Sequence, residues 1–284
     1  MKRKLLNYLF RTVAACCLLA AGGTFLVIFY AIASRGWAAL DWSFFSEQIA
    51  LGGASGGILY QLLGTLILIT TAVVVCAPFA VGIALVHGVY LRDHPIKKQL
   101  TLLLYLMNGV PSILFGILGM MVFVQWLDWG KSWLAGGILL AVMMLPTVAV
   151  TLIERISSLP ERYLDAARGL GLRRSQMIRA VVLPQSIGGL ITGLLLGVAR
   201  AAGETAPIMF TATIFAGASL PSGVRESPVL SLPYHIFILA QDSHDPAVRT
   251  KLWGAALVLL FIVMAFSLAA LPIRLKLHEE SDHV

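Results

Sequence analysis

The sequence predicts an all-α integral membrane protein with six transmembrane helices, and three observations lead to this prediction. Hydrophobic residues make up 58% of the 284 residues, charged residues only 12%, and the mean hydropathy is +0.87. A soluble domain carries roughly 25% charged residues, so this chain lacks the polar surface that a water-soluble protein needs. The other two observations are six long apolar runs and an uneven distribution of positive charge among the loops between them.

The six apolar runs are each long enough to cross a membrane. A spanning helix needs roughly 20 apolar residues, because the hydrocarbon layer is ~30 Å thick and a helix rises ~1.5 Å per residue. Only the fifth run contains charged residues, Arg200 and Glu204. The runs cover residues 12–33, 61–86, 100–127, 133–153, 185–214 and 252–273.

The positive charges predict the orientation of these spans. Six spans put both termini on one side of the membrane. Of the 21 lysines and arginines, 15 lie on that side, five lie on the other, and Arg200 lies within a span. Lysine and arginine favour cytoplasmic loops, so we expect both termini in the cytoplasm. Six of the 15 fall between the fourth and fifth spans: Arg155, Arg162, Arg168, Arg173, Arg174 and Arg179.

The cysteines indicate neither a metal site nor a lipid anchor. Cys16, Cys17 and Cys76 all lie in apolar runs, and no pair has the spacing of metal ligands. The stretch VAAC, which ends at Cys16, resembles a lipoprotein cleavage site. However, Arg11 interrupts the apolar region before it, and the apolar run continues far beyond it. We therefore interpret this stretch as part of the first span, and we expect no metal.

The loop rich in arginine has the pattern of a docking surface. If residues 161–169 form a helix, Tyr163, Ala166, Ala167 and Leu170 share one face at positions i, i+3, i+4 and i+7. Two alanines keep that face flat, so that another protein could approach closely. Gly169 and Gly171 would end this helix, because glycine adopts left-handed angles at little cost. The alternative is a solvated loop whose arginines only fix the topology.

A second helix is expected after this glycine turn. Ser175 is its predicted N-cap, and Pro184 would open the fifth span, since proline is favoured in a first helical turn. A helix–turn–helix of this kind could in principle read DNA. Its attachment to membrane spans at both ends argues against that function, and we expect no nucleic acid partner.

At this loop the chain resembles the permease subunits of ABC importers. Their cytoplasmic loop carries E-A-A, three residues, G, nine residues, then I-x-L-P. Here Asp165, Ala166 and Ala167 are followed at the same spacings by Gly171 and by V-V-L-P at 181–184. Aspartate replaces glutamate and valine replaces isoleucine. The resemblance implies a type I ABC importer permease fold, in which a pair of coupling helices bearing these four residues docks on an ATPase subunit.

Other segments resemble the phosphate-specific permeases of the PstA type. They are LLGVARAAGETAPIMFTA at 195–212, GVPSILFGI at 109–117, and SLPYHIF and LWGAALVLL near the C-terminus. The resemblance covers the chain from about Gly52 onward. It implies an N-terminal helix with a periplasmic loop at 1–57, the transmembrane core domain at 58–273, and a cytoplasmic tail at 274–284.

The two charges in the fifth span are the main candidates for substrate binding. Arg200 and Glu204 are four residues apart, so they should share a helical face, and Gly203 and Pro207 should loosen the helix there. A charge inside the bilayer costs at least ~2.5–3.5 kcal/mol, so the pair should face protein, water or a ligand. The residues alone leave a structural ion pair equally open. The resemblance favours binding of phosphate, whose oxygens suit the planar fork of arginine.

Three further polar residues complete the predicted substrate site. Thr205 adds a hydroxyl beside the charged pair. In the third span, Asn108 and Ser112 flank Pro111, which should kink the helix. Hydrogen bonding between helices is the alternative role for Asn108 and Ser112.

The resemblance therefore implies a permease subunit that moves inorganic phosphate across the bacterial inner membrane. The chain has no G-x-x-x-x-G-K-[ST] loop, so we expect no enzyme activity and no cofactor in it, with ATP and Mg²⁺ bound by a separate ATPase dimer. The other expected partners are a second, related permease subunit, a periplasmic phosphate-binding protein and membrane lipid. Import of sulfate, molybdate or tungstate remains an alternative. So does an ion-coupled transporter or channel with Arg200 and Glu204 as its relay.

Overall fold

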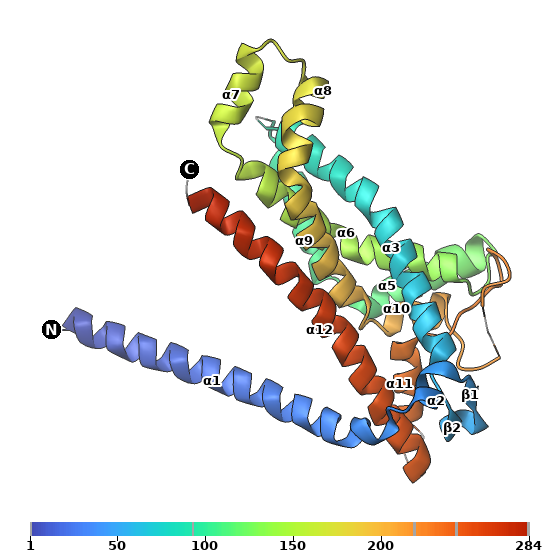
Figure 1. Ribbon diagram of the computed structural model, residues 1–284. Helices are drawn as coiled ribbons and strands as arrows, with labels where there is room; N and C mark the ends of the chain where they lie inside the picture. The colour runs from blue at the N-terminus through green and yellow to red at the C-terminus, as the bar shows by residue number, and fades with distance from the viewer. Residues whose placement is uncertain (1, 93, 218–219, 242–243, 283–284) are drawn as a thin grey trace.

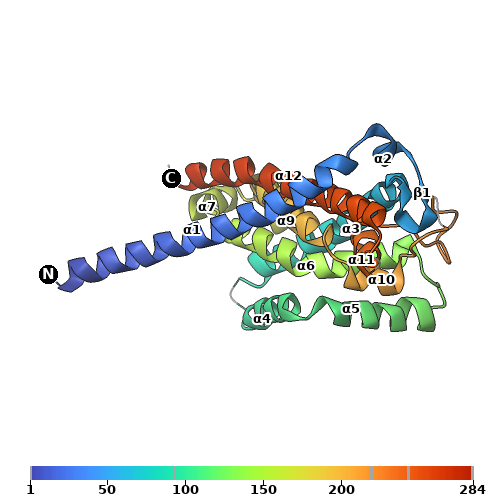
Figure 2. The same ribbon diagram turned by 90° about the horizontal axis from the view of Figure 1, so that it is seen from below.

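The computed structural model describes residues 2–92, 94–217, 220–241 and 244–282, and these are mostly helical (Figures 1 and 2). A two-residue antiparallel hairpin, β1 (Ile49–Ala50) with β2 (Ser55–Gly56), lies between the first two long helices. The α-helices are α1 (Lys2–Gly36), α2 (Trp42–Ser46), α3 (Leu59–Leu85), α4 (Ile96–Gly109), α5 (Ser112–Gly119), α6 (Trp133–Ser157), α7 (Glu161–Gly169), α8 (Arg174–Met177), α9 (Leu183–Ala201), α10 (Ala206–Thr211), α11 (Leu232–Gln241) and α12 (Pro246–Asp282).

The predicted spans are present, but the third and the fifth are interrupted. Five helical segments are long and apolar enough to cross a membrane: Leu6–Ala39, Leu59–Tyr90, Trp133–Ser157, Arg174–Ala201 and Pro246–Pro272. A sixth segment is a bent pair, Ile96–Gly109 with Ser112–Trp126, and its two parts meet at 93°. The chain is therefore a multi-pass membrane protein with five or six spans, depending on how the bent pair is counted.

The bend in the third span replaces the kink that the sequence predicted. Val110 and Pro111 both adopt extended ψ angles, 129° and 133°. Proline has no backbone N–H, and it disfavours helical angles in the residue before it. The helix therefore stops at Gly109, and a new one starts at Ser112, so that α4 and α5 point in different directions.

The fifth span is also interrupted, as the glycine and proline near its charges predicted. Helix α9 ends at Ala201, residues 202–205 leave the helical path, and α10 begins with Pro207 in its first turn. Gly203 lies in the middle of the break. Since α9 ends one residue after Arg200, the break lies beside the two charges of this span.

The core lies where α6 packs between α3 and α9, and small residues make that packing close. Ala72 of α3 and Ala149 of α6 are fully buried. Gly137 and Gly197 lie where the helices approach closely. An added Cβ at Gly137 would lie 2.5 Å from the Thr71 methyl group, and one at Gly197 would lie 3.0 Å from the end of the Met144 side chain. Small residues of this kind let membrane helices approach each other, because lipid supplies no hydrophobic drive for association.

Two glycines of the same helix give a stability prediction. An added Cβ at Gly64 would lie 1.9 Å from the backbone oxygen of Leu230, whereas one at Gly82 meets nothing within 4 Å. Gly64→Ala should therefore cost about 1–3 kcal/mol or more, as overpacking does. Gly82→Ala should be neutral or gain up to ~1 kcal/mol from helix propensity. Thermal unfolding of the purified protein in detergent measures both, and equal stability of the two variants would contradict the close packing at Gly64.

The two ends of the helix bundle carry different elements. Figures 1 and 2 agree that α7 and α8 lie at one end, whereas α2, the β-hairpin and α11 lie at the other. The N-terminal end of α1 and the C-terminal end of α12 lie toward the α7–α8 end. The last described part of α12 thus lies near the arginine-rich loop, whereas α1 diverges from the bundle before it reaches that loop.

A buried histidine in α11, His235, makes the folding stability of the protein depend on pH. His235 is 3% exposed and stacks on Phe215, with 5.8 Å between ring centroids. Burial lowers the pKa of His235 to about 4. The unfolded chain, with a histidine pKa of ~6.5, binds the proton first, so this stability is complete above pH ~6.5 and is lost as the pH falls toward about 4.

The loss should approach roughly 3 kcal/mol at the acid end of this range. Thermal unfolding measured between about pH 7.5 and pH 4.5 should show it, and His235→Gln should flatten this part of the profile. An unchanged profile in the variant would mean that His235 is not the group responsible.

Candidate functional site

The charged pair of the fifth span forms the contact that the sequence predicted. The Nε atom of Arg200 lies 3.7 Å from Oε1 of Glu204. The geometry differs from the expected one, because Glu204 does not share a helical face with Arg200 but lies in the break after α9. The side chains are 36% and 18% exposed. The pair is therefore half-buried within this chain, and the arginine keeps part of its surface free.

Asn108 joins this pair from the third span. Its Oδ1 atom accepts a hydrogen bond from Nη1 of Arg200 at 3.2 Å and another from the hydroxyl of Thr147 at 3.2 Å. Asn108 lies at the end of α4, just before the bend, and Thr147 lies in α6. Three spans thus meet at one amide oxygen. We call Asn108, Thr147, Arg200 and Glu204 the polar cluster.

The structure does not bring the other two predicted residues into the polar cluster. Ser112 is the first residue of α5, and Thr205 precedes the first residue of α10 without capping it through its side chain. Within the described ranges, neither hydroxyl is hydrogen-bonded to the cluster. The two helices do pack together, since an added Cβ at Gly116 would lie 2.8 Å from the backbone oxygen of Ala206. A role in substrate binding stays a prediction for both residues.

The polar cluster leaves Arg200 able to bind an anion. A guanidinium group has five N–H donors in a rigid plane. Asn108 takes one of them, and Glu204 lies beside Nε at ion-pair distance. The remaining donors can form two parallel bonds to a tetrahedral oxyanion. The Arg200 guanidinium group therefore lies beside the breaks that follow α4 and α9, and not in the closely packed core.

The arginine-rich loop folds into the two helices that were expected, and its turn is well defined. Gly171 has a φ of 72°, the left-handed region that favours glycine. Its N–H donates to Arg168 O at 2.9 Å, and the N–H of Leu172 donates to Ala167 O at 3.1 Å. This pair of bonds is a Schellman motif. Gly171 therefore has a structural reason for its position, whereas Gly169 is simply the last residue of α7.

The predicted flat face of α7 is partly wrong. Ala167 is 3% exposed and turned toward its own chain. Ala166 is exposed, Tyr163 is 40% exposed and Leu170 is 80% exposed. Leu164, one turn before Ala167, is partly buried and packs against the hydrophobic core of the bundle, and Ala167 is buried as well. The surface open to another protein therefore contains Tyr163, Ala166 and Leu170, with Asp165 beside them.

The start of α8 also differs from the prediction. The helix begins at Arg174 with Arg173 before it, so Ser175 lies inside the helix and does not cap it. Instead, the side-chain oxygen of Gln176 accepts a hydrogen bond from the backbone N–H of Arg173 at 2.9 Å. The prediction missed this because serine is the stronger N-cap on average.

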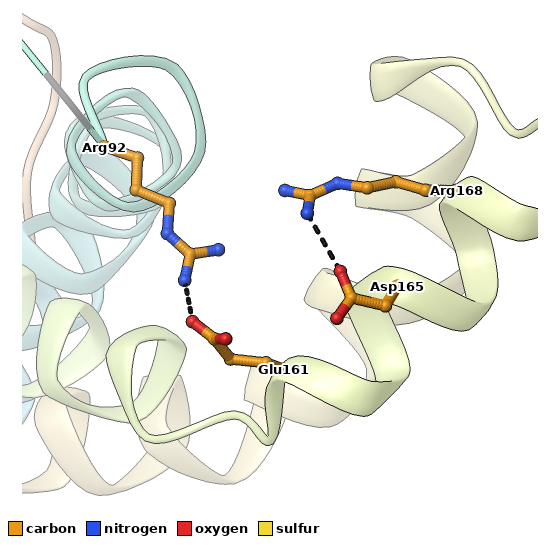
Figure 3. A network of polar contacts seen from close by, with 4 residues as sticks. All are labelled: Arg92, Glu161, Asp165 and Arg168. Atoms are coloured by element: carbon orange, nitrogen blue, oxygen red, sulfur yellow. Dashed lines mark hydrogen bonds and ion pairs between the residues drawn. The ribbon is translucent and has the colours of Figure 1, made fainter.

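Two exposed ion pairs involve α7, and Figure 3 shows both. Asp165 accepts a hydrogen bond from Arg168 at 3.0 Å on the helix itself. Glu161, the first residue of α7, pairs with Arg92. Arg92 follows the span Leu59–Tyr90, which contains α3 and is called the α3 segment below. The second pair connects the loop helices to the end of another span. α7 is thus connected to the bundle in two ways, by the Arg92–Glu161 pair and by the chain that joins it to α6.

Comparison with known families decides the class of this protein. Residues 77–274 match the model of the family described as "Binding-protein-dependent transport system inner membrane component". The chain belongs to this family of ABC transporter permeases. The family match covers the arginine-rich loop, the polar cluster and all spans except the first and part of the second.

The permease is similar to several curated proteins over most of its length. It is 35% identical over 237 residues to "Probable phosphate transport system permease protein PstA" of Methanocaldococcus jannaschii, covering 80% of this chain and 78% of the relative. It is 30% identical over 281 residues to "Phosphate transport system permease protein PstA" of Xylella fastidiosa, covering 97% and 94%. It is 29% identical over 267 residues to PstA 2 of Mycobacterium tuberculosis, covering 93% and 86%.

A solved structure supports the fold. The permease superposes on a chain of the inward-facing MetNI methionine ABC transporter with a TM-score of 0.56, at 14% identity, over 78% of this chain and 97% of that one. At this identity the likeness concerns the fold alone. The type I ABC importer fold that the sequence predicted is thereby confirmed.

Two residues near the site of this permease were missed from the sequence. Thr147 holds Asn108 in place, and a hydroxyl directly after Pro146 in an apolar span was the available signal. Lys131 looked like an ordinary loop charge. Its ammonium group instead donates to the backbone oxygens of Met209 at 2.9 Å and Thr213 at 3.2 Å, and burial lowers its pKa. Lys131 thus holds the end of α10, the short helix that follows the polar cluster.

The loss of this lysine should disturb the region around the break. Lys131→Met leaves two carbonyl oxygens without their charged donor, which should cost about 1–3 kcal/mol. Lys131→Arg should recover part of that stability, because a guanidinium group can reach the same oxygens. Thermal unfolding in detergent measures both effects. If the methionine variant is as stable as the wild type, Lys131 does not hold α10.

Proposed function

We propose that this chain is the membrane-spanning permease subunit of an ATP-driven importer that moves inorganic phosphate across a bacterial inner membrane. The observation that carries the proposal is the polar cluster, with Arg200 held by Asn108 beside a break in the fifth span. The relatives named as phosphate transport permeases support the choice of substrate. In this role the chain binds no cofactor and catalyses no reaction of its own.

Glu204 gives the cluster a means to prefer phosphate. Near neutral pH, phosphate still carries a proton that sulfate lacks. Arg200 attracts both anions, but ionised Glu204 can accept a hydrogen bond only from the protonated one. Sulfate would place an unprotonated oxygen against the carboxylate, which is a repulsive contact. Thr205 and Ser112 are the proposed additional contacts, because Thr205 directly precedes α10 and Ser112 begins α5, each beside one of the two breaks.

A separate ATPase dimer, which binds ATP and Mg²⁺, would dock on α7. The exposed side chains of Tyr163, Ala166 and Leu170 give that helix an apolar surface. Asp165, Ala167 and Gly171 then act less by direct contact than by shaping the helix and its turn. In this arrangement both termini and α7 face the cytoplasm, in agreement with the positive charge on that side.

A second, related permease subunit would complete the pathway. In Figures 1 and 2, α1 diverges from the bundle, and its most apolar window has none of its residues buried within this chain. Contacts with α12 are made by the second half of α1, where Phe29 meets Phe261 and Arg35 lies over Trp253. The polar cluster carries no net charge, so the other subunit should add a cation. A periplasmic phosphate-binding protein would deliver the anion to the α11 end.

Uptake of labelled phosphate tests this function. The complex, reconstituted in vesicles with its partner proteins, should accumulate phosphate only when ATP is present on the α7 side. Import of sulfate, molybdate or tungstate in preference to phosphate would change the substrate. Uptake that needs no ATPase partner would instead support an ion-coupled transporter or channel, in which Arg200 and Glu204 relay a charge.

A further inference from the structure

A pocket of about 210 Å³ lies behind α7, where the loop helices meet the bundle. Its charged lining consists of Arg92, Lys97, Arg168 and Glu161, which come from the loop after the α3 segment, from α4 and from both ends of α7. Three cations thus face one carboxylate. This pocket is separate from the polar cluster, since none of its lining residues belongs to that cluster.

The cations are positioned to act on one ligand. In Figure 3 the guanidinium groups of Arg92 and Arg168 point toward the same gap from opposite sides. Arg168 donates one hydrogen bond to Asp165, but its side chain is 58% exposed, so its other N–H groups can bind a ligand. Lys97 forms no ion pair with the part of the chain that the structure describes. The hydroxyl-bearing Ser157 also lines the pocket.

The rest of the lining is mainly apolar. Val89, Ile156, Leu159, Leu164, Met177 and Val182 form its apolar wall. Because Arg168 and Glu161 are 58% and 75% exposed, water screens these charges, and the attraction for an anion comes from several cations that line one pocket. Arginine and lysine together are the usual donors for phosphate oxygens, arginine through its planar fork and lysine as a point charge.

We propose that this pocket binds a phosphate group, either inorganic phosphate or the headgroup of an acidic phospholipid, and that the bound group competes with Glu161 for Arg92. The competition follows from charge: an anion placed between Arg92 and Arg168 attracts both and repels the carboxylate. Since the Arg92–Glu161 pair connects α7 to the α3 segment, occupation of the pocket would weaken that connection. The site goes beyond the proposed transport function and does not depend on the transported substrate.

Binding of labelled inorganic phosphate to the purified complex tests the site. All variants carry Arg200→Gln, so that binding in the transport pathway does not contribute. Lys97→Gln with Arg168→Gln should weaken binding at least about tenfold, because two charge-assisted contacts are lost. The matched control replaces Lys98 and Arg162, exposed neighbours that do not line the pocket, and it should stay within about twofold of the parent, because neither side chain contacts the ligand.

Glu161→Gln supplies the test of competition, because it should change affinity in the opposite direction. Without the carboxylate, phosphate should bind at least about threefold more tightly. Glu154→Gln, an exposed carboxylate outside the pocket, should leave affinity unchanged. Weaker binding by the Glu161 variant would overturn the competition.

A lipid arm distinguishes the two sources of the phosphate group. Retention of phosphatidic acid, against phosphatidylcholine, is measured for the same variants in nanodiscs without free phosphate. If the Lys97 and Arg168 variant binds inorganic phosphate more weakly but retains phosphatidic acid normally, the ligand of the pocket is the free anion. If only the retention of phosphatidic acid falls, the ligand is the lipid headgroup. If binding falls in both arms, the site accepts either source of the phosphate group. If the variant and its matched control behave alike in both arms, the pocket is not a phosphate site.

Discussion

Replacing Arg200 by glutamine should reduce phosphate uptake by about a hundredfold or more while the complex still assembles. The guanidinium group can form two charge-assisted hydrogen bonds to phosphate oxygens, each worth about 1.5–3 kcal/mol. Glutamine retains a donor for Asn108, whose Oδ1 atom accepts from Arg200 at 3.2 Å in the wild type. The variant therefore removes the anion contact with little damage to the contacts between spans.

The measurement is the initial rate of labelled phosphate uptake into vesicles, normalised to the amount of assembled complex. Arg179→Gln is the matched control, because Arg179 is exposed and lies in the same apolar segment, near its start. The control should transport at nearly the wild-type rate. If Arg200→Gln does so too, the pair with Glu204 is a structural ion pair.

Two neighbouring alanines in α7 should respond to the same substitution in different ways. Ala166→Arg places a charge on the exposed face, where it must be desolvated or must push the ATPase away. It should abolish copurification of the ATPase and leave the thermal stability of the permease nearly unchanged. Ala167→Arg puts the same charge at a position that is 3% exposed. It should destabilise the permease itself by several kcal/mol, as a buried unpaired charge does.

The pair of variants separates docking from folding. Copurification with the ATPase and thermal unfolding of the permease alone are measured for both. Normal ATPase binding by Ala166→Arg would show that the exposed face of α7 is not the contact. Equal destabilisation by both variants would show that the two alanines are not on different faces of the helix.

Features that depend on composition, periodicity and backbone chemistry were predictable from the sequence. The membrane class follows from 58% hydrophobic residues, and the presence of the spans follows from the apolar runs. The span ends do not follow from them: the fifth run covers 185–214, whereas the structure has a span at Arg174–Ala201 with a break after it. Gly171 was predictable as a helix end because few residues other than glycine adopt its φ of 72° at low cost. Arg200 and Glu204 stood out because charge is costly inside a bilayer.

Features that depend on which side of an element meets its neighbour were not predictable in this way. The periodicity of α7 identified an apolar face, but it could not tell that Ala167 packs inward while Ala166 stays exposed. A proline predicts a disturbance of the third span, yet the 93° bend depends on how α4 and α5 pack. Thr147 and Lys131 bind partners 39 or more positions away in the chain, and no local pattern encodes such contacts.

The claim that Arg200 and Glu204 select phosphate over sulfate is tested most directly with a complex that carries Glu204→Gln, by measuring how strongly sulfate inhibits its phosphate uptake. The measurement is labelled phosphate uptake into vesicles with sulfate as competitor, without the periplasmic binding protein, because that protein would itself select the anion. Our account predicts that the wild type resists sulfate and that the variant still transports but is inhibited by it. A variant that transports phosphate and still excludes sulfate fully would contradict the account, even if Arg200 proves to bind the anion.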